Sequence, residues 1–529
     1  MLSLGVYLND IEAIPNWKLR ILREILAHPD LCLTTVYRFE TSCRHKFRPG
    51  RWWEPCFEME MKLERQLFGI ESGERVPGDL LDGTEIVALG NDGQGLSGAF
   101  SPDLIISLEL DLPPELLVVK TRLGALSLQL GEKAYKHEHH VGFWEVLHRQ
   151  AGVRARLIAS GSEFGAQSVI DEAFFNRSFS ISKCRVMALE GAVSLMVKAV
   201  RRLASGELPA GRDAGPDSVQ QHAALPRGRH FLYYLFQFYS GLFVKLLHRL
   251  NYRLRSSRYF CWTLFFGEGD FLDHDKCRTD VVFPCKGEEW ADPFLYKQND
   301  DQYVFFESID HRSQMGKISC GRLLGHELSD IRDVLVKPYH LSYPNIFEDQ
   351  GELYLMPETS GNKRLEIYRC KRFPDSWELY VTAFHGELLF DSSFFDDEFG
   401  QKWLFTNKQT DPNSPVDSEL YIYKVDSLKL NSIIPHPQNP VITDSRVARN
   451  AGRIFSFNGE FYRPSQRNED GIYGKALNLN RIVRLDLEGY SEELVRVFYP
   501  ASNRGLLATH HLHQSEGSFV IDAAFRYLR

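Results

Sequence analysis

Five segments in the C-terminal half of the chain repeat one order of apolar and polar positions. In each, a run of aromatic and aliphatic residues is followed by a turn of Asp, Asn or Gly and by a second aromatic-rich run, as in a β-hairpin. The segments begin at Asp292, Tyr343, Asp391, Ala451 and His510, so successive starts lie 51, 48, 60 and 59 residues apart. A hairpin repeat of about 50 residues is typical of propeller blades, which bury their faces only against neighbouring blades. The pattern therefore predicts an all-β five-bladed β-propeller over residues 261–529.

The first 205 residues follow a different pattern, in which apolar runs alternate with stretches of helical period. The runs that suit buried strands lie at residues 2–8, 31–40, 83–89, 102–110 and 124–130. Pro15 is suited to open an amphipathic helix between the first two runs. Strands that alternate with helices predict a Rossmann-like α/β domain over residues 1–205. Because no Gly-x-Gly-x-x-Gly follows the first run, a dinucleotide site is not expected there.

Two segments connect these predicted domains. Residues 206–228 are rich in Gly, Pro and Ala and lack periodicity, which is typical of a linker. Residues 229–260 combine an aromatic run from Phe231 to Val244 with several basic residues. This run is shorter than the roughly 20 apolar residues that span a bilayer. The segment is predicted to be a helix that either packs between the domains or lies on a membrane surface.

Composition narrows the class of partner and the compartment. With 62 Lys and Arg against 70 Asp and Glu, the net charge is -8, so nucleic acid is not expected as a partner. The nine cysteines include no Cys-x-x-Cys pair, and no metal site is predicted. Residues 1–15 lack the basic start and apolar run of a signal peptide. We therefore expect a cytoplasmic protein, with peripheral contact to the inner membrane surface if residues 229–260 bind lipid. The pattern leaves the oligomeric state open.

Residues 103–147 resemble the N-terminal domain of formyltransferases, the fold shared by methionyl-tRNA and glycinamide ribonucleotide formyltransferases. That family uses 10-formyltetrahydrofolate and carries an Asn-x-His motif followed by a Tyr-Arg-Gly-type loop. Here Ser127 and Gln129 stand at the Asn and His positions, and Tyr135 stands near the loop position. The His is the family's general acid and base, whereas glutamine has no titratable proton. The resemblance therefore implies a formyltransferase-like domain that is inactive and does not use the folate cofactor.

Polar and charged residues stand at corresponding positions of the propeller repeats. Asp292 opens the first hairpin, Tyr343 the second and Asp391 the third, while Glu358 closes the second. The candidates from the later repeats are Arg446, Arg449, Arg463, Gln466, Tyr473, Asn478 and His510. The inner strands of a propeller begin on one face around a channel, so these residues are expected to meet there.

These motifs in combination resemble the propeller domain at the N-terminal end of plant glucosamine inositolphosphorylceramide transferases, which also occurs in bacterial proteins of surface-glycan gene clusters. The resemblance starts near Trp262 and rests on Ala-Asp-Pro-Phe, His-Leu-Ser-Tyr-Pro, Pro-Glu, Asp-x-Arg-x-Ala-Arg and Arg-Pro-x-Gln. In bacterial relatives a formyltransferase-like domain also precedes the propeller. The resemblance therefore implies the same two-domain architecture for this chain.

The predicted propeller further resembles the five-bladed glycosidases of the arabinanase and xylosidase group. Those enzymes use an Asp of the first blade as base, a second Asp that tunes pKa values, and a Glu as acid. Glycosyl chemistry needs two carboxyl groups in different environments on either side of the anomeric carbon. The resemblance implies the base role for Asp292, the tuning role for Asp391 and the acid role for Glu358. Alternatively, Asp292 is a turn residue that caps the strand before Pro293.

Three arginines of the fourth repeat point to the charge of the ligand. Arg446, Arg449 and Arg463 carry forked donors that suit phosphate or carboxylate, which favours an anionic or nucleotide-activated sugar. The alternative is that they form salt bridges with nearby acids such as Asp444 or Glu469.

Taken together, the motifs predict an enzyme, namely a glycosyl-group transferase of bacterial surface polysaccharide or glycolipid biosynthesis. Its site would be the propeller channel, its donor a nucleotide sugar, and no cofactor would be required. The alternatives are a glycoside hydrolase with the same site, a formyltransferase acting on an amino sugar, and a non-catalytic glycan-binding scaffold. Transfer is favoured over hydrolysis because no export signal is found, and polymer hydrolases usually act outside the cytoplasm.

Overall fold

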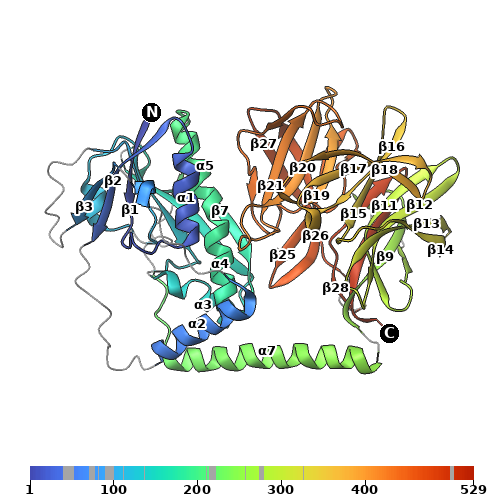
Figure 1. The fold of residues 1–529 in the computed structure, drawn as a ribbon, viewed down its shortest axis with the longest axis horizontal. Helices are drawn as coiled ribbons and strands as arrows, with labels where there is room; N and C mark the ends of the chain where they lie inside the picture. The colour runs from blue at the N-terminus through green and yellow to red at the C-terminus, as the bar shows by residue number, and fades with distance from the viewer. Residues whose placement is uncertain are drawn as a thin grey trace. The chain divides into compact units, whose positions relative to one another are not determined.

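The computed structural model divides the chain into two compact units, drawn in Figure 1. Unit 1 comprises Met1–Gly241 with Asn413–Pro415, and unit 2 comprises Leu242–Pro412 with Val416–Arg529. The residues that the structure describes are 1–39, 53–70, 78–81, 83–89, 101–110, 112–135, 137–161, 163–209, 211–213, 222–255, 258–272, 279–325, 327–500 and 505–528. Among them, no helix combines the length and the apolar character needed to cross a membrane.

Unit 1 is built on an eight-stranded mixed sheet in the order β3-β2-β1-β4-β5-β6-β7-β8. The strands are β1 (Leu2–Tyr7), β2 (Leu31–Phe39), β3 (Glu85–Leu89), β4 (Leu104–Ser107), β5 (Gly124–Leu130), β6 (Gly152–Gly161), β7 (Gly165–Asn176) and β8 (Arg212–Asp213). The first five are parallel to their neighbours, and β6, β7 and β8 are antiparallel. The five predicted strands and the α/β class are confirmed, whereas the Rossmann-like and formyltransferase-like assignments stay predictions.

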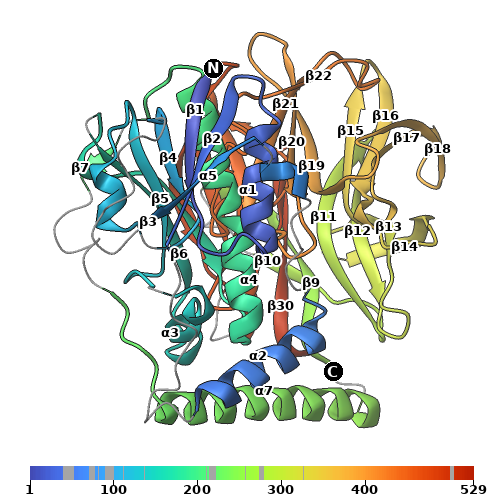
Figure 2. The same ribbon diagram turned by 60° about the vertical axis from the view of Figure 1, so that its left-hand side comes forward.

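The helices of unit 1 pack against this sheet or against one another. They are α1 (Asn16–Leu26), α2 (Glu54–Phe68), α3 (Phe143–Leu147), α4 (Ile181–Gly191) and α5 (Val193–Ala204). Helix α1 follows Pro15, as the sequence predicts, and contacts α4 and α5. The long helix α7 (Gly228–Arg255) begins in unit 1, where it runs beside α2 in both ribbon views (Figures 1 and 2), and its residues beyond Gly241 belong to unit 2. It begins one residue before the predicted basic, aromatic segment of residues 229–260 and ends at Arg255.

The strands of unit 2 form five sheets, which we number as blades in chain order. Blade 1 contains β11 (Glu288–Gln298), β12 (Asp301–Asp310), β13 (Gly316–Leu324) and β14 (Glu327–Leu335). Blade 2 contains β15 (Ser342–Asp349), β16 (Glu352–Glu358), β17 (Leu365–Arg372) and β18 (Ser376–Ala383). Blade 3 contains β19 (Leu388–Asp396), β20 (Lys402–Gln409), β21 (Glu419–Val425), β22 (Ile433–Pro435) and β23 (Ile442–Thr443). Blade 4 contains β24 (Phe455–Phe457), β25 (Glu460–Glu469), β26 (Ile472–Leu485) and β27 (Tyr490–Phe498).

Blade 5 joins segments from both ends of unit 2. It contains β9 (Arg258–Glu268), β10 (Thr279–Val282), β28 (Leu506–Ala508), β29 (Leu512–Ser515) and β30 (Ser518–Leu528). Strand β30 pairs with β29 on one side and with β9 on the other, where Ile521 faces Phe265. A sheet shared in this way closes the ring of blades.

Apolar clusters fill the space between neighbouring blades. One cluster packs Phe294 of blade 1 with Tyr343 of blade 2, and the next packs Phe347 of blade 2 with Leu404 of blade 3. Three further clusters join blades 3 and 4, blades 4 and 5, and blades 5 and 1. Each blade therefore buries both faces against its neighbours, which confirms the predicted five-bladed β-propeller.

Candidate functional site

The first strands of blades 1, 2 and 3 share an unusual backbone at the position that the repeat predicts for the site. Asp292, Tyr343 and Asp391 have φ values of +50°, +46° and +45°, in the left-handed region. The register of each hairpin shifts there, between Ala291 and Phe294 in blade 1 and at the matching positions in blades 2 and 3. A bulge redirects a side chain and disrupts the ladder locally. The same local distortion thus places one polar side chain from each of three blades.

Asp292 lies in a buried network that reaches across three blades. Its carboxylate accepts a hydrogen bond of 3.2 Å from the backbone N–H of Tyr343 in blade 2. Its own backbone N–H donates to Oδ2 of Asp522 at 3.1 Å. Burial raises the pKa of Asp292 well above its usual value, while the charge of His510 opposes that rise. Asp292 is thus a buried carboxyl group placed beside a cation.

The cation beside Asp292 is His510, whose imidazole is held in place by Asp522. Nδ1 of His510 lies 2.7 Å from Oδ2 of Asp522, and Nε2 lies 3.6 Å from Oδ1 of Asp292. The imidazole also stacks on Trp262, with ring centroids 3.9 Å apart. Burial alone would lower the pKa of His510, but Asp522 and Asp292 raise it to about 9. His510 is therefore protonated at neutral pH and can stabilise the ionised form of Asp292.

Arg449 joins the other two predicted carboxyl groups. Its Nε donates to Oδ2 of Asp391 at 2.7 Å, and its Nη2 lies 3.6 Å from Oε2 of Glu358. The guanidinium also lies over the rings of Phe390 and Tyr473. All three charged side chains are nearly closed off from solvent. Blades 2, 3 and 4 therefore contribute one group each to a buried Glu–Arg–Asp cluster.

Glu358 has an electrostatic environment that suits a proton donor. Burial and the negative charge of Asp391 raise the pKa of Glu358 to about 7, although Arg449 opposes the rise. Ser360 Oγ donates to its Oε1 at 2.8 Å. General acids work best when their pKa lies near the working pH. Glu358 and Asp292 are thus two carboxyl groups in different environments, as acid–base chemistry on a sugar requires.

This environment predicts a pH-dependent stability that Glu358→Gln removes. The folded-state pKa of about 7 exceeds the ordinary 4.5, so the folded state binds the proton more tightly. The resulting stabilisation is complete below about pH 4.5 and is lost as the pH rises through 7. Relative to wild type, the free energy of unfolding of Glu358→Gln should therefore increase by about 3 kcal/mol between pH 4.5 and 7. Its melting temperature should rise relative to wild type accordingly. Thermal melts from pH 4 to 8 measure the difference, with the exposed Glu398→Gln as matched control. A difference that is constant with pH would contradict the assigned environment.

Three further predicted residues contact either this cluster or Asp292. Gln466 donates from Nε2 to Oδ2 of Asp391 at 3.3 Å. The hydroxyl of Tyr343 accepts a hydrogen bond of 3.1 Å from the backbone N–H of Gly452. Tyr473 touches both His510 and Arg449 through its ring and keeps 38% of its surface exposed. Tyr473 is thus the solvent-facing member of the group.

The other predicted ligand-binding residues are engaged elsewhere in blade 4. Arg446 forms a two-pronged ion pair with Asp444, the partner that the salt-bridge alternative names. Arg463 is buried and binds Glu492 through Nε and Nη2. The side chain of Asn478 donates to the backbone O of Arg446 at 2.7 Å. The ligand-binding roles of these three residues stay predictions.

Several residues of the centre were not predicted from the sequence. Asp522 is fully buried and also accepts hydrogen bonds of 3.0 Å from the backbone N–H groups of His510 and His511. Glu307 closes the hairpin of blade 1 and lies 2.8 Å from Nε2 of His340. The raised pKa of His340 is caused first by its hydrogen bond to Glu307. Glu307 pairs with Ala291 as Glu358 pairs with Ser342, so the two glutamates stand at equivalent hairpin ends, as their places in the sequence repeats indicate.

Two groups within the described residues have donor atoms close enough to share a metal ion. They are Asp292, His510 and Asp522, and separately Cys261, Glu289 and His311, with all donor atoms of a group within 4.8 Å of one another. In the first group, a cation would compete with the protonated His510 for Asp292 and Asp522. The prediction that no metal is needed stays a prediction.

The fold and the site define a five-bladed propeller with a carboxylate–arginine–histidine centre. Residues 277–515 match the family described as glucosamine inositolphosphorylceramide transferase 1, N-terminal. The chain is 35% identical over 219 residues to glucosamine inositolphosphorylceramide transferase 1 of Oryza sativa subsp. japonica, which is 41% of this chain and 29% of that protein. The protein of the same name from Arabidopsis thaliana is 34% identical over 219 residues, or 41% of this chain and 28% of the relative. The chain thus spans less than a third of the length of these relatives.

Solved structures with similarity to the chain include several carbohydrate hydrolases. A β-xylosidase is 11% identical with a TM-score of 0.34, covering 45% of this chain and 92% of that chain. Xylan β-1,4-xylosidase from Bacillus halodurans is 14% identical with a TM-score of 0.33, covering 45% of this chain and 50% of that chain. Scores at this level support no conclusion. The propeller assignment rests on the strand pairing and the interblade clusters.

Proposed function

We propose that unit 2 is a glycosyl-group transferase whose site is the cluster of Asp292, Glu358, Asp391 and Arg449. The observation that carries the proposal is the contrast between two buried carboxyl groups. Burial raises the pKa of both groups, but Asp292 lies 3.6 Å from the protonated His510, which favours its ionised form, whereas Glu358 has a pKa of about 7. In glycosyl transfer, Asp292 would accept the proton of the attacking hydroxyl group and Glu358 would protonate the leaving oxygen. Asp391 would add to the effect of burial, since its negative charge also raises the pKa of Asp292 and of Glu358.

The guanidinium of Arg449 supports an anionic or nucleotide-activated sugar as substrate. Arg449 bridges two carboxylates, and a phosphate group that displaces either of them would gain a forked donor. Tyr473 offers an exposed aromatic ring beside this guanidinium, on which a sugar or base can pack. The names of the plant relatives support a glycolipid as the acceptor class. A role in bacterial surface polysaccharide synthesis is part of the proposal as well.

The activity for which the plant relatives are named is part of the proposal for this chain. The similarity covers 29% of the rice protein, so the remaining 71% of that protein has no counterpart in the alignment. A non-catalytic glycan-binding role for the propeller therefore stays a competing hypothesis. It predicts ligand binding without turnover.

A product assay tests these possibilities directly. The full chain is incubated with nucleotide sugars or sugar phosphates and a bacterial lipid extract, and products are identified by mass spectrometry. We expect a new glycosylated lipid or saccharide that is absent with Glu358→Gln. Saturable sugar binding by calorimetry without any product would favour the scaffold hypothesis and contradict the proposal.

Hydrolysis is a second candidate, which the pKa of Glu358 favours. A phosphate leaving group is a weak base and needs little protonation, whereas an alkoxide that leaves from a glycosidic bond needs a general acid. A carboxyl group with a pKa of about 7 suits the latter. Incubation with oligosaccharides in H₂¹⁸O separates the two functions. Label in the new reducing end would show hydrolysis, and a product that joins donor to acceptor without label would show transfer.

For unit 1, we predict that no formyl group is transferred from 10-formyltetrahydrofolate to amino sugars. Ser127 and Gln129 lie on β5, and neither side chain titrates near neutral pH. Mass spectrometry of the amino sugar after incubation and calorimetry with the folate cofactor provide the measurement. Formylation that disappears with Gln129→Ala, but persists with Asp300→Asn in unit 2, would contradict this prediction.

A further inference from the structure

Helix α7 carries apolar side chains on two opposite faces. One face is buried within unit 1, where Phe231 packs against Trp53 and Phe57, and Phe238 packs against Phe68 of α2. Tyr234, between them, hydrogen-bonds to the buried Glu64 and accepts from the backbone N–H of Ile181. This face therefore fixes the part of α7 up to Gly241, which belongs to unit 1, to the rest of that unit.

The other face is an exposed apolar stripe along the helix. Leu232, Phe236, Phe243, Leu247 and Leu250 follow one another at intervals of 4, 7, 4 and 3 residues, the spacing of a single helix face. Each of them is between 44% and 70% exposed. Tyr233, Tyr239, Val244 and Leu246 border this stripe and are exposed as well. The stripe from 232 to 250 is about 27 Å long, which is far more than scattered surface apolar residues provide.

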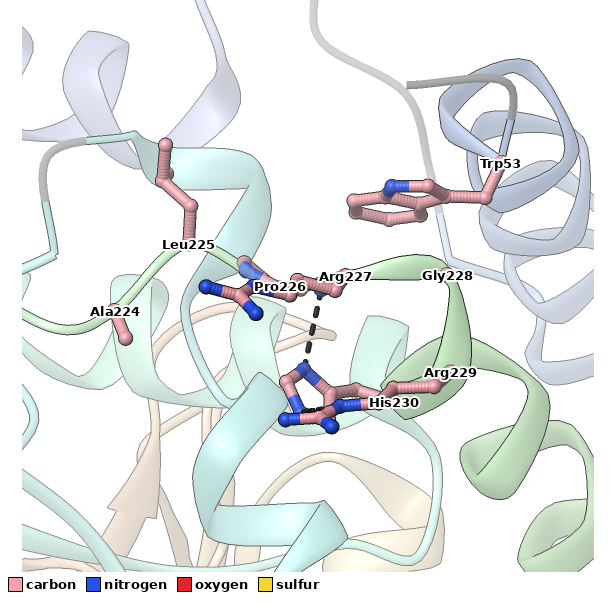
Figure 3. A pocket seen from close by; sticks show the side chains of 8 residues that line it. All are labelled: Trp53, Ala224, Leu225, Pro226, Arg227, Gly228, Arg229 and His230. Carbon is pink, nitrogen blue, oxygen red and sulfur yellow. Dashed lines mark hydrogen bonds between the residues drawn. The ribbon is translucent and has the colours of Figure 1, made fainter. Parts of the chain in front are cut away.

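The helix sequence is basic and contains no acidic residue, and Arg229 shares the face of the stripe. The 28 residues of α7 include Arg229, Lys245, Arg249, Arg253 and Arg255 but no Asp or Glu. Near the start of the helix, Arg227, Arg229 and His230 line a pocket of about 690 Å³ together with Trp53 (Figure 3). The side chains of Arg253 and Arg255 lie outside the described part of the structure. The helix is thus cationic in a chain whose net charge is -8.

We propose that α7 docks the protein on the surface of an anionic phospholipid bilayer. The stripe would enter the boundary between headgroups and acyl chains, where Arg229, on the same face, would contact lipid phosphates. Lys245 and Arg249 lie on the other side of the helix and would add only longer-range attraction to the anionic surface. The helix would lie in the plane of the membrane, with the side that carries Phe231 and Phe238 turned away from the lipid and packed on α2. A second copy of the chain fits this surface less well, since pairing two such helices would bring like charges together. The proposal concerns binding only and is independent of the sugar chemistry of unit 2.

Vesicle co-sedimentation of the full chain tests the proposal. Wild type should sediment with vesicles of phosphatidylcholine and phosphatidylglycerol, and less at about 0.5 M salt than at about 0.1 M salt, because salt screens the basic residues. The triple variant Phe236→Ser, Phe243→Ser, Leu247→Ser should bind at least about tenfold more weakly. Phe399→Ser, at an 86% exposed position of unit 2, is the matched control and should bind like wild type.

A second pair of variants tests the charge. Arg229→Glu with Arg249→Glu should weaken binding to the anionic vesicles, whereas Arg372→Glu in unit 2 should not. Thermal melts of all variants show whether each is folded, and sedimentation equilibrium without lipid measures self-association. Two outcomes would overturn the proposal. One is wild-type binding that is absent or unaffected by the triple variant, and the other is a wild-type dimer that the triple variant converts to monomer.

Discussion

Asp292→Asn is expected to lower the rate of the glycosyl reaction by at least about a hundredfold while leaving the melting temperature unchanged or slightly higher. A positioned general base contributes about 10²–10⁴-fold to a rate, and an amide cannot take its place. The fold should tolerate the change because Asn readily adopts the left-handed conformation found here and can still accept the hydrogen bond from Tyr343. Burial raises the pKa of Asp292, so the ionised form costs folding energy that Asn removes.

Product formation by mass spectrometry and thermal unfolding together measure this result. Asp300→Asn, at an exposed position in the same hairpin, is the matched control and should keep both activity and stability. A destabilisation of several kcal/mol by Asp292→Asn would support the alternative that Asp292 is a structural turn residue. Full activity with unchanged stability would remove Asp292 from the site.

Arg449→Met is expected to destabilise the protein by about 3–5 kcal/mol, because it leaves Asp391 and Glu358 buried without their common cation. For a unit of this size the loss corresponds to a fall in melting temperature of roughly 10 °C. Adding Asp391→Asn should recover part of the loss, since it removes the carboxylate that paired with Arg449 at 2.7 Å. The free energy of unfolding from denaturant titration measures both variants.

Arg446→Met provides the comparison for this second prediction. Arg446 lies three positions earlier and pairs with Asp444, but 28% of its side chain is exposed. Partly exposed ion pairs contribute at most about 1 kcal/mol, so its loss should be small. If Arg449→Met and Arg446→Met lowered the free energy of unfolding equally, Arg449 would not be the buried cation on which Asp391 and Glu358 depend.

The hairpins and much of the site could be predicted from the sequence because both repeat. Equivalent starts placed Asp292, Tyr343 and Asp391 at one position of successive blades, and the structure gives all three the same backbone. Asp522 could not be found in this way. It stands in the run Phe519–Ala524, whose apolar character indicates a buried strand and hides the single carboxylate.

The separation of Arg463 from the cluster follows from strand geometry. Residues three apart in a strand point to opposite faces, so β25 cannot direct both Arg463 and Gln466 toward Asp391. Gln466 makes that contact, and Arg463 binds Glu492 instead. The parity of the spacing was visible in the sequence, but the identity of the partner required the pairing of blade 4. In unit 1, the apolar runs were enough to place the parallel strands, whereas the antiparallel β6 and β7 were not anticipated.

Ring closure has a consequence for how the protein is made. Phe265 of β9 pairs with Ile521 of β30, and 256 positions separate the two residues in the chain. Strand β9 therefore cannot form this pairing until β30 has been synthesised. While a ribosome is still translating the intervening blades, β9 presents an unpaired edge, which is a hazard for aggregation. The strand that relieves the hazard also carries Asp522, which orients His510 and bonds to the backbone of Asp292. A nascent or truncated chain without β30 therefore lacks Asp522 and cannot assemble the centre, so the proposed chemistry requires the closed ring.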